Sequence, residues 1–259
     1  MDMRREADVA LCRSALYEAL ALGFRRPTVE TVARLASAGG AAALADAAAV
    51  LDGERDSDLA QRVRRLASSP VPPSLEALQA AYPRLFGHTA RGAVPPYETE
   101  YGEDSPFLPA QEMSDLAAFF RAFGLALRPA GHERIDHIGC ECEFLLFLAR
   151  KEAYALERGD QAMREETRRA ARLFLRDHLG RFAPAFGKKL AREDAGGFYG
   201  ALGELCAAFV TQECARAAVA AGPEVLRLRS TTDADAPMAC GSGEQLLQIT
   251  PAAPREEAG

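Results

Sequence analysis

Hydrophobic residues recur in steps of three and four over one long stretch near the middle of the chain, residues 135–156. The apolar or small positions of this stretch are Ile138, Cys142, Leu145, Ala149, Ala153 and Leu156. Their spacing predicts one face of an α-helix, and between residues 144 and 148 apolar side chains follow without a break. Because a helix that is apolar nearly all round lies inside a protein, we expect this stretch to form the central helix. Asp136 is its expected N-cap.

The same periodicity predicts a series of shorter helices on both sides of the central one. Their approximate ranges are 5–24, 29–37, 41–51, 56–67, 74–87, 110–124, 165–179 and 198–221. We expect Gly39-Gly40 to end the second of them and residues 182–186 to form a short turn. No segment alternates with β-branched residues, so no sheet is predicted.

The fold class that follows is all-α, with a single globular helical domain over residues 1–229. From residue 230 onward the composition shifts to Thr, Asp, Ala, Pro, Gly and Glu. We therefore expect a mobile tail over residues 230–259, with one ordered contact around Leu246, Leu247 and Ile249.

Residues 88–110 are irregular, because they contain four prolines and two glycines. Loops of this length inside a domain are usually functional or disordered. Tyr97 and Tyr101 flank Glu98 and Glu100, which is more aromatic than a solvated linker. Two interpretations stay open at this point: a structural strap pinned to the helices by its tyrosines, or a binding segment.

Composition narrows the class of protein. The chain has 259 residues, a hydrophobic content of 48% and a net charge of −6, which argues against nucleic acid as a partner. Arg4-Arg5 is followed by Glu6 and Asp8, whereas a twin-arginine export signal needs an uncharged apolar stretch behind the pair. No later stretch has the length of a membrane span, so we expect a protein that is neither exported nor inserted in a membrane.

The cysteines and the missing catalytic motifs favour a cytoplasmic protein that is not an enzyme. Six cysteines are scattered along the chain, as is typical of reduced core thiols in a cytoplasmic protein. There is no phosphate-binding or dinucleotide-binding glycine loop, no Gly-x-Ser-x-Gly and no His-Glu-x-x-His. We therefore predict no enzyme activity, no cofactor and no metal. A metal or redox protein using Cys140, Cys142, Cys240 and His132 is kept as an alternative class, although neighbouring thiols about 200° apart on a helix cannot share a metal.

The pair Asp136-His137 lies at the start of the central helix and has two interpretations. One is a capping aspartate with a neighbouring histidine. The other is a charged, hydrogen-bonding rim beside an apolar groove, which could hold a peptide that carries arginine. The spacing alone does not choose between them.

Four motifs follow one another along the chain: YPRLFG at 82–87, PPYETEY at 95–101, DHI at 136–138 with Glu141 and Phe144-Leu145, and FLRDHL at 174–179 followed by Phe182, Pro184 and Phe186. In this order they resemble the TorD/DmsD/NarJ family of cytoplasmic chaperones for molybdenum-containing oxidoreductases. The second resembles the family's Pro-Pro-Tyr-Glu-Ser-x-Tyr segment. The sequence departs from the family at Ile135, which replaces a usual proline, at Phe182, which replaces a frequent tryptophan, and at Glu100.

The resemblance implies an all-helical chaperone that binds the precursor of a molybdopterin oxidoreductase, through its twin-arginine signal peptide or its apo catalytic subunit, until the cofactor is inserted. The residues it assigns to precursor binding are Pro96, Tyr97, Glu98, Tyr101, Asp136, His137 and Glu141. Within that set, Glu98 and Asp136 would face the arginines. A family branch that binds only the mature catalytic subunit is the first alternative, and a nucleotide switch is disfavoured by the missing phosphate loop. Either a monomer or a domain-swapped dimer is compatible with a helical bundle that has long loops.

Overall fold

The computed structural model describes residues 3–55, 57–67, 73–87, 91–104, 107–128, 133–230 and 249–251, the last as backbone only. Its elements are α1 (Met3–Phe24), α2 (Val29–Thr31), η1 (Val32–Ala36), α3 (Ala38–Arg55), α4 (Leu59–Arg65), α5 (Leu75–Phe86), η2 (Glu98–Glu100), α6 (Leu108–Ala122), β1 (Leu125–Leu127), α7 (Ile138–Arg158), α8 (Gln161–Asp177), α9 (Leu179–Glu193), α10 (Phe198–Arg216) and β2 (Ile249–Pro251). The predicted all-α fold is confirmed.

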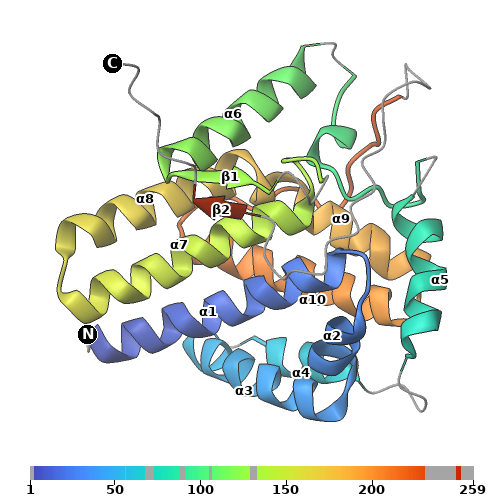
Figure 1. Ribbon diagram of the computed structural model, residues 1–259, viewed down its shortest axis with the longest axis horizontal. Coiled ribbons are helices and arrows are strands. Elements are labelled where there is room, and N and C mark those ends of the chain that lie inside the picture. Colours follow the sequence, from blue (N-terminus) through green and yellow to red (C-terminus); the bar gives the residue numbers. More distant parts are fainter. Residues whose placement is uncertain are drawn as a thin grey trace.

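Two long helices, α1 and α7, lie side by side through the middle of the molecule (Figure 1). Both bury most of their length, because each offers apolar or small side chains on more than one face. The helix pair α9–α10 packs behind them, α3–α4 lies below α1, and α8 folds back along α7 (Figure 1). The prediction that the stretch around residues 135–156 is the central helix is therefore confirmed.

The start of α7 differs from the prediction in one respect. The N-cap is His137, whose Nδ1 accepts a hydrogen bond from the backbone N–H of Gly139 at 3.0 Å. Asp136 lies one residue earlier and its carboxylate is bonded to Thr99 and Arg134 instead. The prediction of Asp136 as N-cap was wrong, because its side chain finds stronger tertiary partners than the free amides of the helix.

Two predictions that relied on glycine or proline as a helix breaker were also wrong. Gly39-Gly40 does not end a helix but lies in the first turn of α3, after a break at Ser37. Residues 182–186 are not a turn but the interior of α9, with Pro184 inside the helix. In both places a buried apolar face outweighs the local preference of the residue.

One small sheet was missed by the sequence pattern. Strands β1 and β2 pair antiparallel, with Leu125 opposite Pro251 and Leu127 opposite Ile249. Three residues are too few to show the alternation that identifies a strand. The contact expected around Ile249 thus involves β1, whereas Leu246, Leu247 and the rest of the predicted mobile tail lie outside the described residues.

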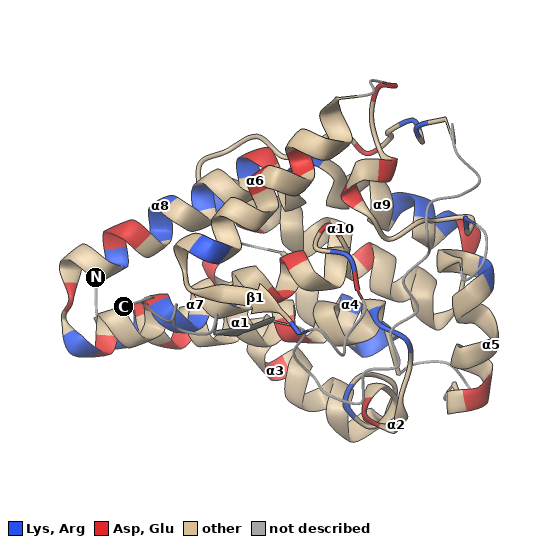
Figure 2. Cartoon of the chain, turned by 45° about the horizontal axis from the view of Figure 1, so that its top comes forward, with Lys and Arg blue, Asp and Glu red and all other residues tan. Residues whose placement is uncertain are grey.

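Within the described ranges, no single helix combines the length and the apolar composition of a membrane span, and only the pair Val29–Ala36 and Ala38–Arg55, bent by 56°, satisfies both together. Charged residues of both signs are interspersed along α8 (Figure 2).

Candidate functional site

The segment of residues 94–101, called the strap below, is bound to the entrance of α7 through its backbone. The Glu98 N–H donates to the Asp136 carbonyl at 2.9 Å, and the Ile138 N–H donates to the Pro96 carbonyl at 2.8 Å. Between them Tyr97 and His137 form an antiparallel bridge. Pro96 supplies a carbonyl without needing a partner for an N–H, which suits it to this position. The strap therefore lies directly across the first residues of the central helix.

The far end of the strap is held by Tyr101. Its ring is buried against Phe182 and Phe186, with centroids 5.7 and 6.4 Å away, and its hydroxyl donates to the Pro95 carbonyl at 2.8 Å. A bridge to Leu228 joins it to the segment that follows α10. The interpretation of Tyr101 as a pin that attaches the strap to the helices is confirmed.

Glu98 carries a fully buried carboxylate on the strap. Its Oε1 accepts from Arg181 Nη2 at 2.6 Å, and its Oε2 lies 3.1 Å from His178 Nδ1. Arg181 begins α9 and His178 ends α8, so the strap is tied to the junction of these helices. The carboxylate that the sequence assigns to an incoming arginine thus already holds an arginine of the chain itself.

The same arginine links Glu98 to a second buried acid, Glu112 of α6. Arg181 Nη2 lies 2.6 Å from Glu112 Oε1, and Arg229 forms a bidentate pair with the same carboxylate at 2.9 and 3.0 Å. Burial by itself would raise the pKa of Glu112, but the hydrogen bonds and charges of these two arginines hold it below its usual range. Arg229 also donates to the Thr99 carbonyl at 2.9 Å, so this network fixes the strap from below.

Asp136 is the second buried carboxylate, and it too holds an arginine. Arg134 Nε lies 3.0 Å from Asp136 Oδ1 and Arg134 Nη2 lies 2.8 Å from Oδ2. The Thr99 hydroxyl donates to Oδ2 at 2.6 Å. The guanidinium carbon of Arg134 stands 4.4 Å from the centroid of the Tyr97 ring. Asp136 is fully buried, whereas the side chain of Arg134 is 31% exposed.

Two more side chains at this entrance are buried with unused hydrogen-bonding capacity. His137 Nδ1 is the acceptor of the Gly139 N–H, so in the neutral ring the proton is on Nε2, which has no partner among the described residues. Burial lowers the pKa of His137, which favours that neutral ring. Both carboxyl oxygens of Glu141 likewise lack a partner in the described part of the chain. Burial, together with the charges of Glu98 and Asp136, raises the pKa of Glu141 well above its ordinary value.

All seven residues that the sequence assigned to binding therefore gather around the strap and the entrance of α7, and all of them are buried. The sequence did not predict their partners. Thr99 lies in the strap and Arg134 is two residues from Asp136, whereas His178 and Arg181 come from the junction of α8 and α9. Glu112 and Arg229 extend the network through Arg181 and the Thr99 carbonyl. No local signal could have identified Arg229, because its role depends on where the chain returns after α10.

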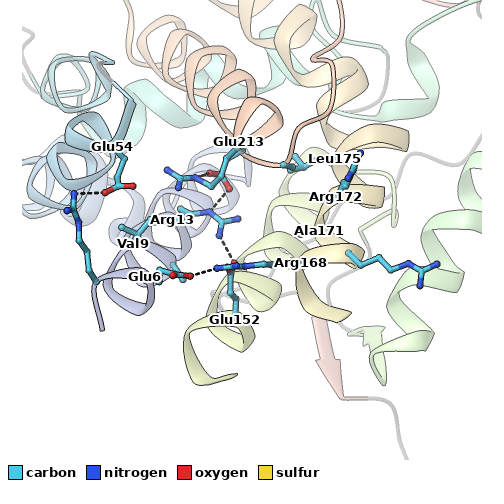
Figure 3. Close-up of a pocket in the computed structure, with 15 residues that line it drawn as sticks. Glu6, Val9, Arg13, Glu54, Glu152, Arg168, Ala171, Arg172, Leu175 and Glu213 are labelled. Carbon is cyan, nitrogen blue, oxygen red and sulfur yellow. Dashed lines mark hydrogen bonds and ion pairs between the residues drawn. The ribbon is translucent and has the colours of Figure 1, made fainter. Parts of the chain in front are cut away.

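A concave region lies between α1, α7, α8 and α10, away from the strap. It encloses about 540 Å³ and contains none of the seven residues. Arg13 lies there between Glu213 and Glu152, at 2.7 and 2.6 Å, and Arg168 reaches Glu6 (Figure 3). These pairs join α1 to the three other helices, so we interpret this region as a structural clamp.

The metal-site alternative finds no support in the part of the chain that the structure describes. No group of three or more His, Cys, Asp or Glu side chains there is arranged to hold a metal ion. Cys140 and Cys142 are buried thiols, and burial raises the pKa of both. His132 and Cys240 lie outside the described residues.

Comparison with known proteins identifies relatives of this site region. Residues 51–187 match the sequence profile of a family described as "Nitrate reductase delta subunit". A "Chaperone protein TorD" of Photobacterium profundum is 30% identical over 141 residues, which are 53% of this chain and 62% of that protein. A "Selenate reductase assembly chaperone protein" of Thauera selenatis is 37% identical over 141 residues, 52% of this chain and 70% of that protein. A Vibrio cholerae "Chaperone protein TorD" is 30% identical over 138 residues, 52% of this chain and 60% of that protein.

Proposed function

We propose a function that proceeds from one fact: this chain belongs to the nitrate reductase delta subunit family, which includes TorD-like and NarJ-like proteins. One relative is named as a chaperone and another as an assembly chaperone for selenate reductase, and these names suggest a related role here. In the proposed function, the protein is a cytoplasmic chaperone without enzyme activity of its own. It binds the precursor of a molybdopterin-containing oxidoreductase and holds it until the cofactor is inserted. The precursor is called the client below.

One observation supports this function most directly: the strap and the entrance of α7 are built to bind guanidinium groups. Two fully buried carboxylates, Glu98 and Asp136, each hold an arginine of the chain at 2.6 to 3.0 Å. A twin-arginine signal peptide carries two adjacent guanidinium groups. Charge-assisted pairs between arginine and a carboxylate are strong and directional, so this site has the chemistry that such a peptide requires.

The unpartnered groups at the same place suit a peptide backbone. The Nε2–H of His137 is a buried donor and Glu141 offers buried oxygens. Leaving such groups without a partner costs about 1–3 kcal/mol each, so a chain that supplies the missing hydrogen bonds is bound more tightly than one that does not. In the proposed complex, Tyr97 provides a flat amphipathic contact and Pro96 holds the strap against α7.

The test uses a molybdopterin oxidoreductase from the same genome, expressed with this chain in three forms: the full precursor, the precursor without its leader, and the precursor with both leader arginines changed to lysine. Co-purification and calorimetry measure binding. We expect the full precursor to bind and the lysine form to lose at least about tenfold in affinity, because lysine cannot form the bidentate pair. Equal binding of all three forms would refute recognition through the leader.

Binding of the leader-less form with unchanged affinity would instead assign the chain to the branch that binds only the mature catalytic subunit. A double variant, Glu98→Gln with Asp136→Asn, keeps the shape of both side chains and removes their charge. We expect it to abolish leader binding, and urea unfolding of the same variant separates this effect from a loss of folding. Glu157→Gln, on an exposed part of α7, is the matched control for loss of a carboxylate.

A further inference from the structure

The surroundings of Arg134 form a complete recognition site for one guanidinium group. Asp136 accepts two parallel hydrogen bonds from it, at 3.0 and 2.8 Å. The Thr99 hydroxyl lies 2.7 Å from Nη2, and the Tyr97 ring stacks against the guanidinium plane at 4.4 Å. A carboxylate fork, a hydroxyl and an aromatic face are the three groups that bind arginine best.

The receptor groups are buried, whereas the side chain of the arginine is partly exposed. Asp136 is fully buried and is also bonded to the Thr99 hydroxyl at 2.6 Å. The Tyr97 hydroxyl donates to Glu133 at 3.1 Å. Arg134 enters from the loop before α7, and its side chain is 31% exposed. Its partial exposure gives it a route to solvent when another guanidinium group takes over its hydrogen bonds to Asp136 and Thr99.

We propose that Asp136, Thr99 and Tyr97 form a guanidinium-binding site that Arg134 occupies in the free chain, and that an arginine of the client takes the place of Arg134 in the complex. This proposal rests on the proposed function. It adds that, in the free chain, the guanidinium group of Arg134 fills the site that a guanidinium group of the client occupies in the complex.

Arg181 does not have this role, although it also holds a buried carboxylate. It lies on α9 and binds Glu98 and Glu112 together, each at 2.6 Å. Its withdrawal would leave Glu98 with His178 and Glu112 with Arg229, but it would break the direct ion pair that ties the strap to α9. Withdrawal of Arg134 leaves that ion pair in place, so Arg134 is the arginine that exchanges and Arg181 keeps the strap on α9.

The exchange has a measurable consequence for affinity. A site that is free for only a fraction of the time binds an external ligand more weakly by that same fraction. Arg134 is two residues from Asp136, so it competes at a high effective concentration. If Arg134 leaves the site open about one-tenth of the time, its removal tightens client binding about tenfold.

The first experiment tests the receptor without any client. In Arg134→Ala the guanidinium site is vacant, and we expect the midpoint of thermal unfolding to fall by several degrees. Millimolar methylguanidinium chloride should restore much of this loss, but should not stabilise the unmodified chain. Arg150→Ala is the matched control, because Arg150 pairs with Glu18 at 2.9 Å on the surface and leaves no buried site. If methylguanidinium raises the unfolding midpoint of both variants equally, the proposed guanidinium-binding site is refuted.

The second experiment tests the exchange by calorimetry with the client's leader peptide. Arg134→Ala should bind it about tenfold more tightly than the unmodified chain. Arg134→Lys keeps the positive charge beside Asp136 and preserves folding should the alanine variant fail to fold, and we expect an intermediate gain. Unchanged or weaker binding by both variants would refute the exchange. Rescue by methylguanidinium together with unchanged leader affinity would leave Arg134 as a structural clamp. If no form of the chain binds the leader, it is the proposed function that fails.

Discussion

Replacing Glu141 by glutamine should stabilise the protein at neutral pH. Glu141 is fully buried at the entrance of α7, and neither of its oxygens has a partner among the described residues. Burial and the nearby charges of Glu98 and Asp136 raise its pKa well above the ordinary value of 4.5. Glutamine has the same shape and no charge, so it removes the cost of keeping this buried group protonated.

The magnitude follows from proton linkage. Above pH 4.5 the unfolded chain releases the Glu141 proton, whereas the folded chain keeps it because its pKa is raised. The folded state then binds more protons, so stability falls as pH rises, by about 1.4 kcal/mol for each pH unit over which this difference persists. The stabilisation by glutamine should therefore grow with pH from 5 to 7 for as long as the folded chain keeps the proton.

Urea unfolding at pH 5, 6 and 7 measures this difference, with the midpoint and the slope recorded for both proteins. Glu157→Gln is the control, because this exposed side chain should show no such trend. The reasoning would be refuted by a free-energy difference that is the same at all three pH values, or by a glutamine variant that is less stable at pH 7.

Three other predictions concern the helices that support the site. Arg13→Ala should cost about 3 kcal/mol in guanidinium chloride unfolding, because it removes one arginine partner from each of two buried glutamates; a loss below about 1 kcal/mol would contradict the clamp. Gly203→Ala should cost about 1–3 kcal/mol, because its methyl group would lie 2.5 Å from the Gly187 carbonyl where α9 and α10 cross; an unchanged melting temperature would argue against so close a crossing. Cys140 and Cys142 should react with iodoacetamide only after unfolding, because burial raises the pKa of both thiols; rapid alkylation of the native protein would show that α7 opens.

The sequence predicted elements well where periodicity was strong and poorly where a single residue type was taken as a stop signal. Residues 5–24 and 135–156 carry long apolar faces, and both became central helices. Gly39-Gly40 and Pro184 were interpreted as helix breakers, yet both lie inside helices. Burying the apolar face of α9 gains more than the missing N–H of Pro184 costs.

The amino-acid sequence by itself determined the all-α class, the central position of α7 and the residues that meet at its entrance. It could do so because these properties depend on local periodicity and on motifs that are contiguous in the chain. Only the tertiary structure decided that Asp136 and Glu98 already hold arginines. Arg181 reaches Glu98 from α9, and nothing within a few residues of the strap encodes its approach. Arg134 is only two residues from Asp136, but the fold places its guanidinium group against Thr99 and Tyr97 of the strap. A buried charge needs a partner wherever the fold can supply one, and that choice is made by packing across the whole molecule.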